Sequence, residues 1–272
     1  MKRIDLIKVE HNVTIGDKCK YKEPNVTEDC IFYDNGEPIG FYLTKMPEKM
    51  CKLADLANIE FNSKRVPKQD MTRTNFKEIK DLNGNIIGYE DRQDLNGGGV
   101  VKQMSAIIGS IAPKPHLGRN YPNKHSNHGI KSAQTFIKAM LLLSKESEQL
   151  IKEILPKQYE HQIELFKDVS NKWKFGNLFT SSISNFNISA PFHKDGLNII
   201  GAVNVIICKK FNSKGGDLHV PDYNATIGQQ DNSILVYPAW RNVHGVTPII
   251  PTHEGGYRNS LVFYPLKAFK GI

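Results

Sequence analysis

Hydrophobic and polar positions follow one pattern up to about residue 174 and another after it. From Ser132 to Leu155, apolar residues recur every three to four positions with charges between them, and the run stops at Pro156. This pattern predicts an amphipathic helix, and a second helix is predicted from Gln158 to about Trp173. After Phe175 the apolar residues form short runs, which predict β-strands. These runs are residues 178–188, 199–208, 218–220, 233–237, 246–250 and 260–264.

Turn signals punctuate the first half of the chain. Asp-Asn-Gly at residues 34–36 and Asn-Gly at 83–84 are tight-turn sequences, and each predicts a β-hairpin. The second turn lies between the runs 76–79 and 86–89. A glycine triplet at 97–99 predicts a hinge, and the apolar run from Val100 to Ala112 fits either a buried strand or a short helix.

Short strands at near-regular spacing, preceded by helices, predict an α+β fold. We expect a double-stranded β-helix, a jelly roll of the cupin type, buttressed by N-terminal helices. Gly215-Gly216-Asp217 supplies a turn between two of its strands. The length fits a single catalytic domain over residues 1–272, with N-terminal strands and supporting helices in 1–174 and the jelly-roll core with its metal site in 175–272.

The chain is basic, with a formal net charge of +8. Such a charge favours a polyanionic partner, because neutralising phosphates releases condensed counterions. Residues 113–131 contain no acidic residue and are predicted to form a basic loop over a groove; scattered lysine is an equally good interpretation. The nucleic-acid contacts expected from this loop are Lys114, Arg119, Lys124 and Lys131.

Cysteine spacing and hydropathy indicate where in the cell the protein is expected. The four cysteines form no CxxC pair, so reduced thiols are expected, and a zinc site built from Cys19, Cys30 and Cys51 is a lesser alternative. No apolar run approaches membrane-spanning length. We therefore expect an intracellular monomer that makes no membrane contact, in a nucleus or in a prokaryotic or viral cytoplasm or nucleoid.

A set of metal-ligand residues stands in the strand-rich half. His193 and Asp195 are two apart, so in a strand they project to the same side. His244 lies much later in the chain, in a short apolar stretch that ends at a proline. Two imidazoles and one carboxylate form the facial triad of non-haem iron oxygenases and leave the other coordination positions open. A bare His-x-Asp is weak evidence, but its order before His244 and Arg258 predicts a metal site with catalytic ligands.

The last predicted strand repeats the two-residue spacing. Arg258 and Ser260 share one face with Val262 and Tyr264. A guanidinium fork beside a hydroxyl fits a carboxylate, such as the distal carboxylate of 2-oxoglutarate. The opposite face, with Leu261 and Phe263, is predicted to pack against a second layer. For the other carboxylate of 2-oxoglutarate, four residues stay open: Asn185, Asn187, Arg119 and Arg241.

These residues resemble the TET/JBP family of nucleic-acid base hydroxylases. HKDGLN at residues 193–198 is similar to the family's His-x-Asp-x-x-Asn, and RNSLVFY at 258–264 to its Arg-x-Ser-Leu-Val-Phe-Tyr strand. The resemblance covers about Phe175 to Lys267. It implies an Fe(II)/2-oxoglutarate dioxygenase that uses oxygen, with ascorbate as reductant. It also implies that Asn198 meets the target base and Tyr264 stacks on it; without the resemblance these would be a turn residue and a core residue.

The same resemblance implies a substrate: the 5-methyl group of a pyrimidine in DNA, on a base that is flipped out or single-stranded. Leu266 stands where TET enzymes carry a base-contacting histidine, and the span from Asp195 to His244 is compact as in the JBP enzymes. Thymine, giving 5-hydroxymethyluracil, is therefore favoured over 5-methylcytosine, giving 5-hydroxymethylcytosine. The alternatives are a 2-oxoglutarate-dependent hydroxylase of a peptide, such as a prolyl hydroxylase, or of a small molecule, and a non-catalytic cupin-like module that binds DNA or metal.

Overall fold

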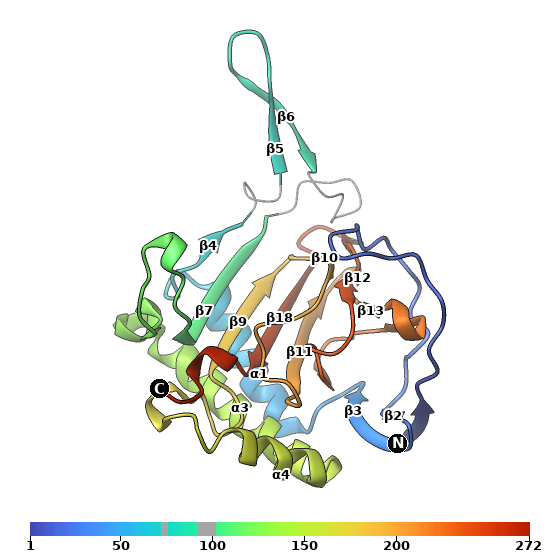
Figure 1. Cartoon of the computed structure of the whole chain (residues 1–272). Coiled ribbons are helices and arrows are strands. Elements are labelled where there is room, and N and C mark those ends of the chain that lie inside the picture. Colours follow the sequence, from blue (N-terminus) through green and yellow to red (C-terminus); the bar gives the residue numbers. More distant parts are fainter. Residues whose placement is uncertain (72–75, 92–101) are drawn as a thin grey trace.

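Two facing sheets form the centre of the computed structural model, which describes residues 1–71, 76–91 and 102–272 (Figure 1). The glycine triplet at 97–99 lies outside the described residues. The larger sheet has ten strands. In spatial order they are β1 (Lys2–Asp5), β2 (Cys30–Asp34), β3 (Glu37–Leu43), β15 (Ser233–Tyr237), β11 (Asn204–Phe211), β18 (Tyr257–Tyr264), β9 (Ser181–Phe186), β7 (Met104–Ile111) and β4 (Gln69–Asp70), with β8 (Asn123–Lys124) paired to β7.

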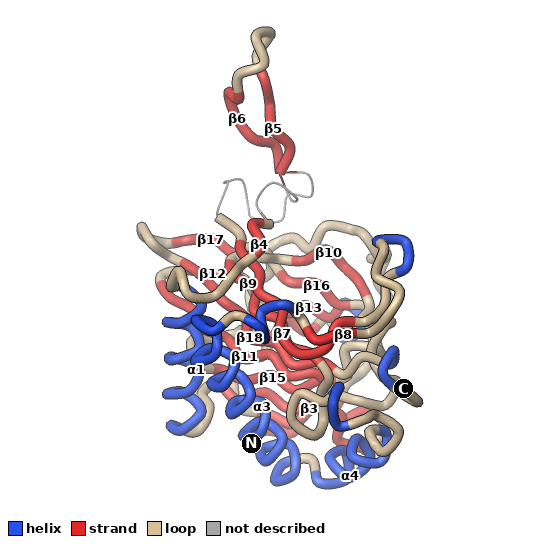
Figure 2. The backbone as a smooth tube through the Cα atoms, turned by 90° about the vertical axis from the view of Figure 1, so that its left-hand side faces the viewer, coloured by secondary structure: helices blue, strands red, loops and turns tan. Residues whose placement is uncertain are grey.

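The smaller sheet carries four strands, and two further pairs lie at the edges of the molecule. The order of the smaller sheet is β10 (Ala190–His193), β16 (His244–Val246), β13 (Leu218–Val220) and β14 (Ala225–Ile227). The pairs are β12 (Ser213–Gly215) with β17 (Ile249–Pro251) and β5 (Phe76–Lys80) with β6 (Ile86–Asp91). The β5–β6 hairpin projects from the rest of the molecule (Figure 2).

Helices cover the outer face of the large sheet (Figure 2). They are α1 (Glu48–Asn62), α3 (Gln134–Ile154) and α4 (Pro156–Leu165). The main core lies between α1, α3 and this sheet. The short 3₁₀ helices of the described chain are η1 (Pro115–Leu117), η2 (Ser126–Gly129), η3 (Lys131–Ala133), η4 (Asn171–Trp173), η5 (Pro221–Tyr223) and η6 (Lys267–Phe269).

The α+β class is confirmed, and so are several local predictions. Both hairpin turns are present, as the β2–β3 and β5–β6 pairs, and at the first of them Asn35 and Gly36 adopt φ values of 51° and 81°. In the described part of the segment left open between Val100 and Ala112, residues 104–111 form the strand β7. The predicted helix of residues 132–155 is α3. In the large sheet, strands from the first half of the chain flank those from the second half on both sides, since β3 pairs with β15 and β7 with β9.

Several boundaries differ from the predictions; for example, the run 199–208 is a strand only from Asn204, where β11 begins. The second helix ends at Leu165, because Phe166 and Val169 turn away to pack in a separate cluster with Phe269. The strand predicted over 246–250 is two strands in different sheets, β16 and β17, separated at Pro248. Helix α1 was not predicted. Within the described residues, no helix is long and apolar enough to span a membrane.

The strand β18 separates the core from the space between the sheets. Its residues Leu261 and Phe263 are fully buried on the helix side, as the two-residue spacing predicts. The Phe263 ring lies 6.1 Å from that of Phe175 and 5.8 Å from that of Phe179, measured between centroids. Packing on this face therefore fixes the strand whose other face meets the inter-sheet space.

Replacing Phe263 with alanine should lower the free energy of unfolding by about 3–5 kcal/mol, because it leaves a cavity in a packed aromatic cluster. Urea denaturation followed by circular dichroism measures the change. Phe211→Ala, at a ring that is 54% exposed on β11, serves as the control and should cost less than about 1 kcal/mol. Equal losses in the two variants would contradict this role of Phe263.

Candidate active site

The three predicted metal ligands come together between the sheets. His193 ends β10 and His244 begins β16, and the two residues are direct partners in this antiparallel pair. Asp195 follows two residues after His193, and one ligand atom from each side chain lies within 4.8 Å of the others. Across the described residues, no second group of three histidine, cysteine, aspartate or glutamate side chains is gathered in this way. The four cysteines are buried and unpaired.

Backbone hydrogen bonds orient both imidazoles in the same manner. Nδ1 of His193 lies 2.8 Å from the carbonyl oxygen of Pro191, and Nδ1 of His244 lies 3.0 Å from that of Asn242. In each case the acceptor is the residue two positions earlier. With Nδ1 donating its proton, each ring presents the lone pair of Nε2 to the shared space. This is the tautomer that a metal ligand requires.

Two amides hold the carboxylate of Asp195. Its Oδ2 accepts hydrogen bonds from Nδ2 of Asn198 at 3.2 Å and from Nδ2 of Asn204 at 3.0 Å. The amide of Asn198 also donates to Oδ1 of Asn204 at 2.9 Å. The other oxygen, Oδ1, lies 3.4 Å from Nε2 of His193. Asp195 therefore presents one oxygen to a metal while the second is anchored.

Asn204 is a site residue that sequence reasoning missed. It is 1% exposed on β11, and it stands as the one polar residue in the apolar run 202–208. A buried amide needs hydrogen-bonding partners, so its position in that run was a usable signal. What the run does not reveal is that the partner is Asp195.

Burial and charge set the protonation of the triad. Burial lowers the pKa of His244 to about 4, with a contribution from the nearby His193. Burial also opposes charge on Asp195, but the hydrogen bond and charge of His193 outweigh it and lower the pKa of the carboxyl. For His193, burial is outweighed by the interaction with Asp195, and the pKa is raised. The site thus favours one positive charge next to the Asp195 carboxylate. A proton on His193 can supply this charge, and a divalent metal would supply it in place of the proton.

A cavity of about 390 Å³ opens in front of the triad. Arg258, Ser260, Val262 and Tyr264 all line it, so the shared strand face predicted from the sequence is confirmed. The cavity belongs to the size range in which proteins bind small molecules. Its other lining residues include Asn185, Asn198, Asn204, Leu197 and Leu266.

Arg258 is buried at the base of this cavity without a carboxylate of its own. It is 2% exposed, one terminal nitrogen donates to Oε1 of Gln229, and Nε has no hydrogen-bonding partner. In the part of the chain that the structure describes, no salt bridge involves it. The neighbouring acid, Asp217, lies 3.7 Å from Nζ of Lys210. A buried, incompletely satisfied guanidinium is costly, and an incoming carboxylate would complete its hydrogen bonds.

A glycine makes room for this arginine. Gly216 has φ +70°, and a Cβ atom there would lie 2.7 Å from Cδ and 3.1 Å from Nε of Arg258. The turn predicted at Gly215-Gly216-Asp217 thus has a second role. Besides reversing the chain after β12, it lets the backbone pack directly on the guanidinium.

The residues predicted to meet substrate occupy the same cavity. Both protons of the Asn198 amide are used by Asp195 and Asn204, so its carbonyl oxygen remains for a ligand. Tyr264 lines the cavity and burial raises the pKa of its hydroxyl, which keeps the ring neutral. Leu266 also lines the cavity.

One of the four residues left open for the second carboxylate reaches the cavity. Asn185 lines it, and its Oδ1 accepts a hydrogen bond from Ser105 at 3.1 Å, which leaves the amide nitrogen for the cavity. Asn187 instead accepts a hydrogen bond from the backbone of β18. Arg241 is ion-paired with an aspartate of β2. Neither Arg241 nor Arg119 lines the cavity.

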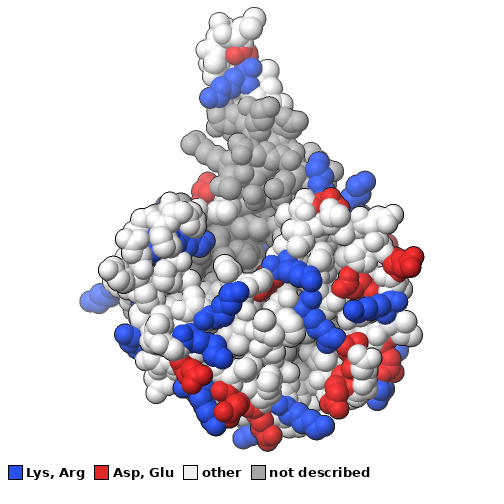
Figure 3. Space-filling view, in the orientation of Figure 1, with Lys and Arg blue, Asp and Glu red and all other residues white. Residues whose placement is uncertain are grey.

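The basic loop of residues 113–131 does not reach the cavity. Lys124 is half-buried, and its ammonium donates to Oγ of Ser110 at 3.0 Å; burial lowers the pKa of this amine. Figure 3 shows basic side chains spread over one face and interspersed with acidic ones. The four expected contacts stay predictions: Lys114 and Lys131, which are exposed, and Arg119 and Lys124, which are half-buried.

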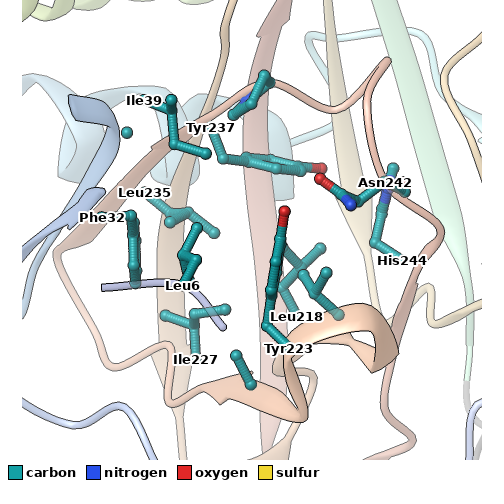
Figure 4. Close-up of a pocket in the computed structure, with 14 residues that line it drawn as sticks. Leu6, Phe32, Ile39, Leu218, Tyr223, Ile227, Leu235, Tyr237, Asn242 and His244 are labelled. Atoms are coloured by element: carbon teal, nitrogen blue, oxygen red, sulfur yellow. The ribbon is translucent and has the colours of Figure 1, made fainter. Parts of the chain in front are cut away.

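A second, smaller cavity lies on the other side of His244 (Figure 4). His244, Tyr237 and Leu218 line both cavities. The remaining walls are almost entirely apolar, and the polar groups of Tyr223, Tyr237 and Asn242 gather at one end. His244 is therefore flanked by a largely apolar space on this side.

Comparison with known proteins identifies the fold. No family model matches the sequence, and no curated protein matches it. Among solved structures, the chain is similar to NgTET1 in complex with 5mC DNA, with a TM-score of 0.59 at 15% identity, covering 97% of this chain and 85% of that one. The chain thus has the fold of NgTET1.

Two weaker structural matches were also found. The first is an oxidoreductase of the 2OG-Fe(II) oxygenase family from Burkholderia pseudomallei (TM-score 0.42, 12% identity, covering 83% of this chain and 84% of that one). The second is OsALKBH1 (TM-score 0.39, 12% identity, covering 90% of this chain and 100% of that one).

Asn204→Leu should weaken metal binding about 10- to 100-fold, the usual cost of losing a group that orients a ligand. The reason is that Asp195 loses one of its two anchoring amides. Titration of the metal-free protein with Fe(II) or Co(II) measures the affinity. Asn185→Leu, in the same cavity but without contact to Asp195, is the matched control and should bind metal normally; a similar loss in both variants would remove Asn204 from this role.

Proposed function

We propose that the protein is an Fe(II)- and 2-oxoglutarate-dependent dioxygenase. The observation that carries the proposal is the buried guanidinium of Arg258, which lacks a carboxylate partner and faces the same cavity as the His193, Asp195 and His244 triad. A triad alone would fit many divalent metals. The added anion site, supported by Ser260, fits a dicarboxylate that binds metal at one end and arginine at the other.

The residues present fit both groups. His193 and His244 would offer Nε2, and Asp195 would offer Oδ1, as an open facial triad for Fe(II). Arg258 and Ser260 would bind the distal carboxylate of 2-oxoglutarate, and Asn185, the one of the four candidates that lines the cavity, would donate to its other carboxylate. Iron, 2-oxoglutarate and oxygen together supply the oxidising power for hydroxylating a C–H bond. We interpret the two facing sheets around this site as the walls of a double-stranded β-helix.

The substrate we propose is the methyl group of a pyrimidine base in DNA, with thymine favoured. The amide nitrogen of Asn198 is used by Asp195 and Asn204, so its side-chain carbonyl oxygen would accept a hydrogen bond from N3–H of thymine. Leu266 offers no donor to the N3 acceptor of a cytosine edge. Tyr264 supplies an aromatic face on which a base can stack. The net charge of +8 and the fold shared with NgTET1, which was solved with 5mC DNA, support a DNA substrate.

The test is direct identification of the product. The iron-loaded protein is incubated with 2-oxoglutarate, ascorbate and DNA that contains either thymine without methylated cytosine or 5-methylcytosine, and the digested nucleosides are analysed by mass spectrometry. We expect 5-hydroxymethyl-2′-deoxyuridine from the first DNA. Asp195→Ala serves as the inactive control. Succinate without a hydroxymethyl nucleoside would point to a peptide or small-molecule substrate, and the absence of both would contradict the proposed activity.

Arg258→Ala should raise the KM for 2-oxoglutarate about 30-fold or more while metal affinity stays within about twofold, because a buried charge-assisted contact costs at least 2 kcal/mol when truncated. Succinate formation at varied 2-oxoglutarate gives the KM. The control is Arg241→Ala, which removes an arginine that is ion-paired outside the cavity. Unchanged kinetics in Arg258→Ala would exclude it from the anion site.

Tyr264→Ala should reduce hydroxylation of DNA about tenfold or more through lost base stacking. Decarboxylation of 2-oxoglutarate without DNA should fall much less, since Tyr264 is not among the groups assigned to that co-substrate. Parallel assays of hydroxylated nucleoside and succinate separate the two effects. Equal losses would identify Tyr264 as a structural residue.

A further inference from the structure

One exposed apolar side chain stands at the mouth of the catalytic cavity. Leu197 lines the cavity and is 62% exposed, although the next two residues along the chain, Asn198 and Ile199, are both 3% exposed. A single exposed leucine is ordinary on a protein surface. Its position beside the opening to the metal site, and the way its backbone is fixed, are what distinguish it.

The loop that carries Leu197 is fastened on both sides. The carbonyl oxygen of Leu197 accepts a hydrogen bond from the backbone of Lys267 at 3.0 Å, and Nζ of Lys267 donates to the carbonyl oxygen of Gly196 at 2.8 Å. The backbone of Ile199 donates to Pro265 at 2.8 Å. The loop is thus tied to the segment that follows β18, so the leucine side chain is held outward.

Two exposed lysines belong to the segments that hold this apolar tip. Lys194 precedes it in the loop and Lys267 lies across from it, and both are exposed. Within the described residues, neither forms an ion pair with a carboxylate. Binding of a free nucleotide would not account for an exposed apolar side chain with lysines nearby at the edge of the cavity, because such a ligand would lie inside the cavity. This arrangement fits a double helix, whose phosphates meet the lysines and whose stacked bases offer an apolar gap.

We propose that Leu197 is a wedge that enters the base stack of duplex DNA and occupies the space left by the target base. The inference rests on the proposed DNA hydroxylase function and names a step that function leaves open. A base inside a duplex must leave the stack to reach the metal site, and unstacking is unfavourable. Filling the vacated gap with an apolar side chain offsets this cost and delays the return of the base. A single-stranded substrate has no such gap.

The test compares Leu197→Ser with wild type on a duplex and on the single strand that carries the same target base. Initial rates of nucleoside hydroxylation at subsaturating DNA should fall about tenfold or more on the duplex, while the single-strand rate stays within about twofold. Leu197→Met, an unbranched apolar side chain of similar volume, should restore most of the duplex rate. Ile200→Ser is the matched control, because Ile200 is 71% exposed in the same loop region but does not line the cavity.

A second readout does not depend on turnover. The metal-free protein is titrated with a duplex that carries 2-aminopurine next to the target base, since the fluorescence of this base rises when it unstacks. Wild type should raise the fluorescence, and Leu197→Ser should not do so even when saturated with DNA. Thermal unfolding serves as the folding control. Because residue 197 is exposed, its variants should unfold at nearly the same temperature as wild type.

The remaining outcomes overturn the wedge in distinguishable ways. Equal losses on duplex and single strand, or no loss on either, would show that Leu197 does not act on the stack. Wild-type activity on single strands alone would overturn the wedge and leave the proposed function standing. No hydroxylated nucleoside from either DNA would contradict the proposed function and the wedge together.

Discussion

The site depends on burying a guanidinium that has no carboxylate of its own. Arg258 sits at the base of the cavity, and the charges next to it, Lys210 and Asp217, offset one another. A divalent metal on the triad would leave a further positive charge after Asp195 is counted. With such a metal in place, a ligand with two negative charges would make the cavity neutral. A dicarboxylate such as 2-oxoglutarate meets that condition, and a neutral ligand does not.

Several neighbouring residues accommodate the buried guanidinium of Arg258. Gly216 is needed because any side chain there would collide with the arginine. Gln229, in the segment between β14 and β15, accepts one of its hydrogen bonds. On the other face of β18, Leu261 and Phe263 pack into the core and hold the strand in place. The polar face of β18, which is costly to bury, is thus held in place by the buried apolar face of the same strand.

The features that were predictable from sequence are those that depend on short spacings. His193 with Asp195, and Arg258 with Ser260 and Tyr264, share a face because alternation in a strand is a local property. Contacts across the fold leave no such signal, so the anchoring of Asp195 by Asn204 and the pairing of Arg258 with Gln229 were not foreseen. The charge of residues 113–131 was visible, but Lys124 turns its ammonium inward to Ser110. The composition of a segment gives its charge but not the direction in which each charged side chain points.

Asn198 links the two halves of the site in a way that neither spacing nor resemblance indicates. Its amide nitrogen donates to Asp195, a proposed metal ligand, while in the proposed function its side-chain carbonyl oxygen would meet a base. The amide group is polarisable, so a hydrogen bond accepted by the oxygen strengthens those donated by the nitrogen. Binding of a base would then tighten the anchor of Asp195 at the moment when the substrate is in place. The same side chain that recognises the base would thereby stabilise the metal geometry needed to oxidise it.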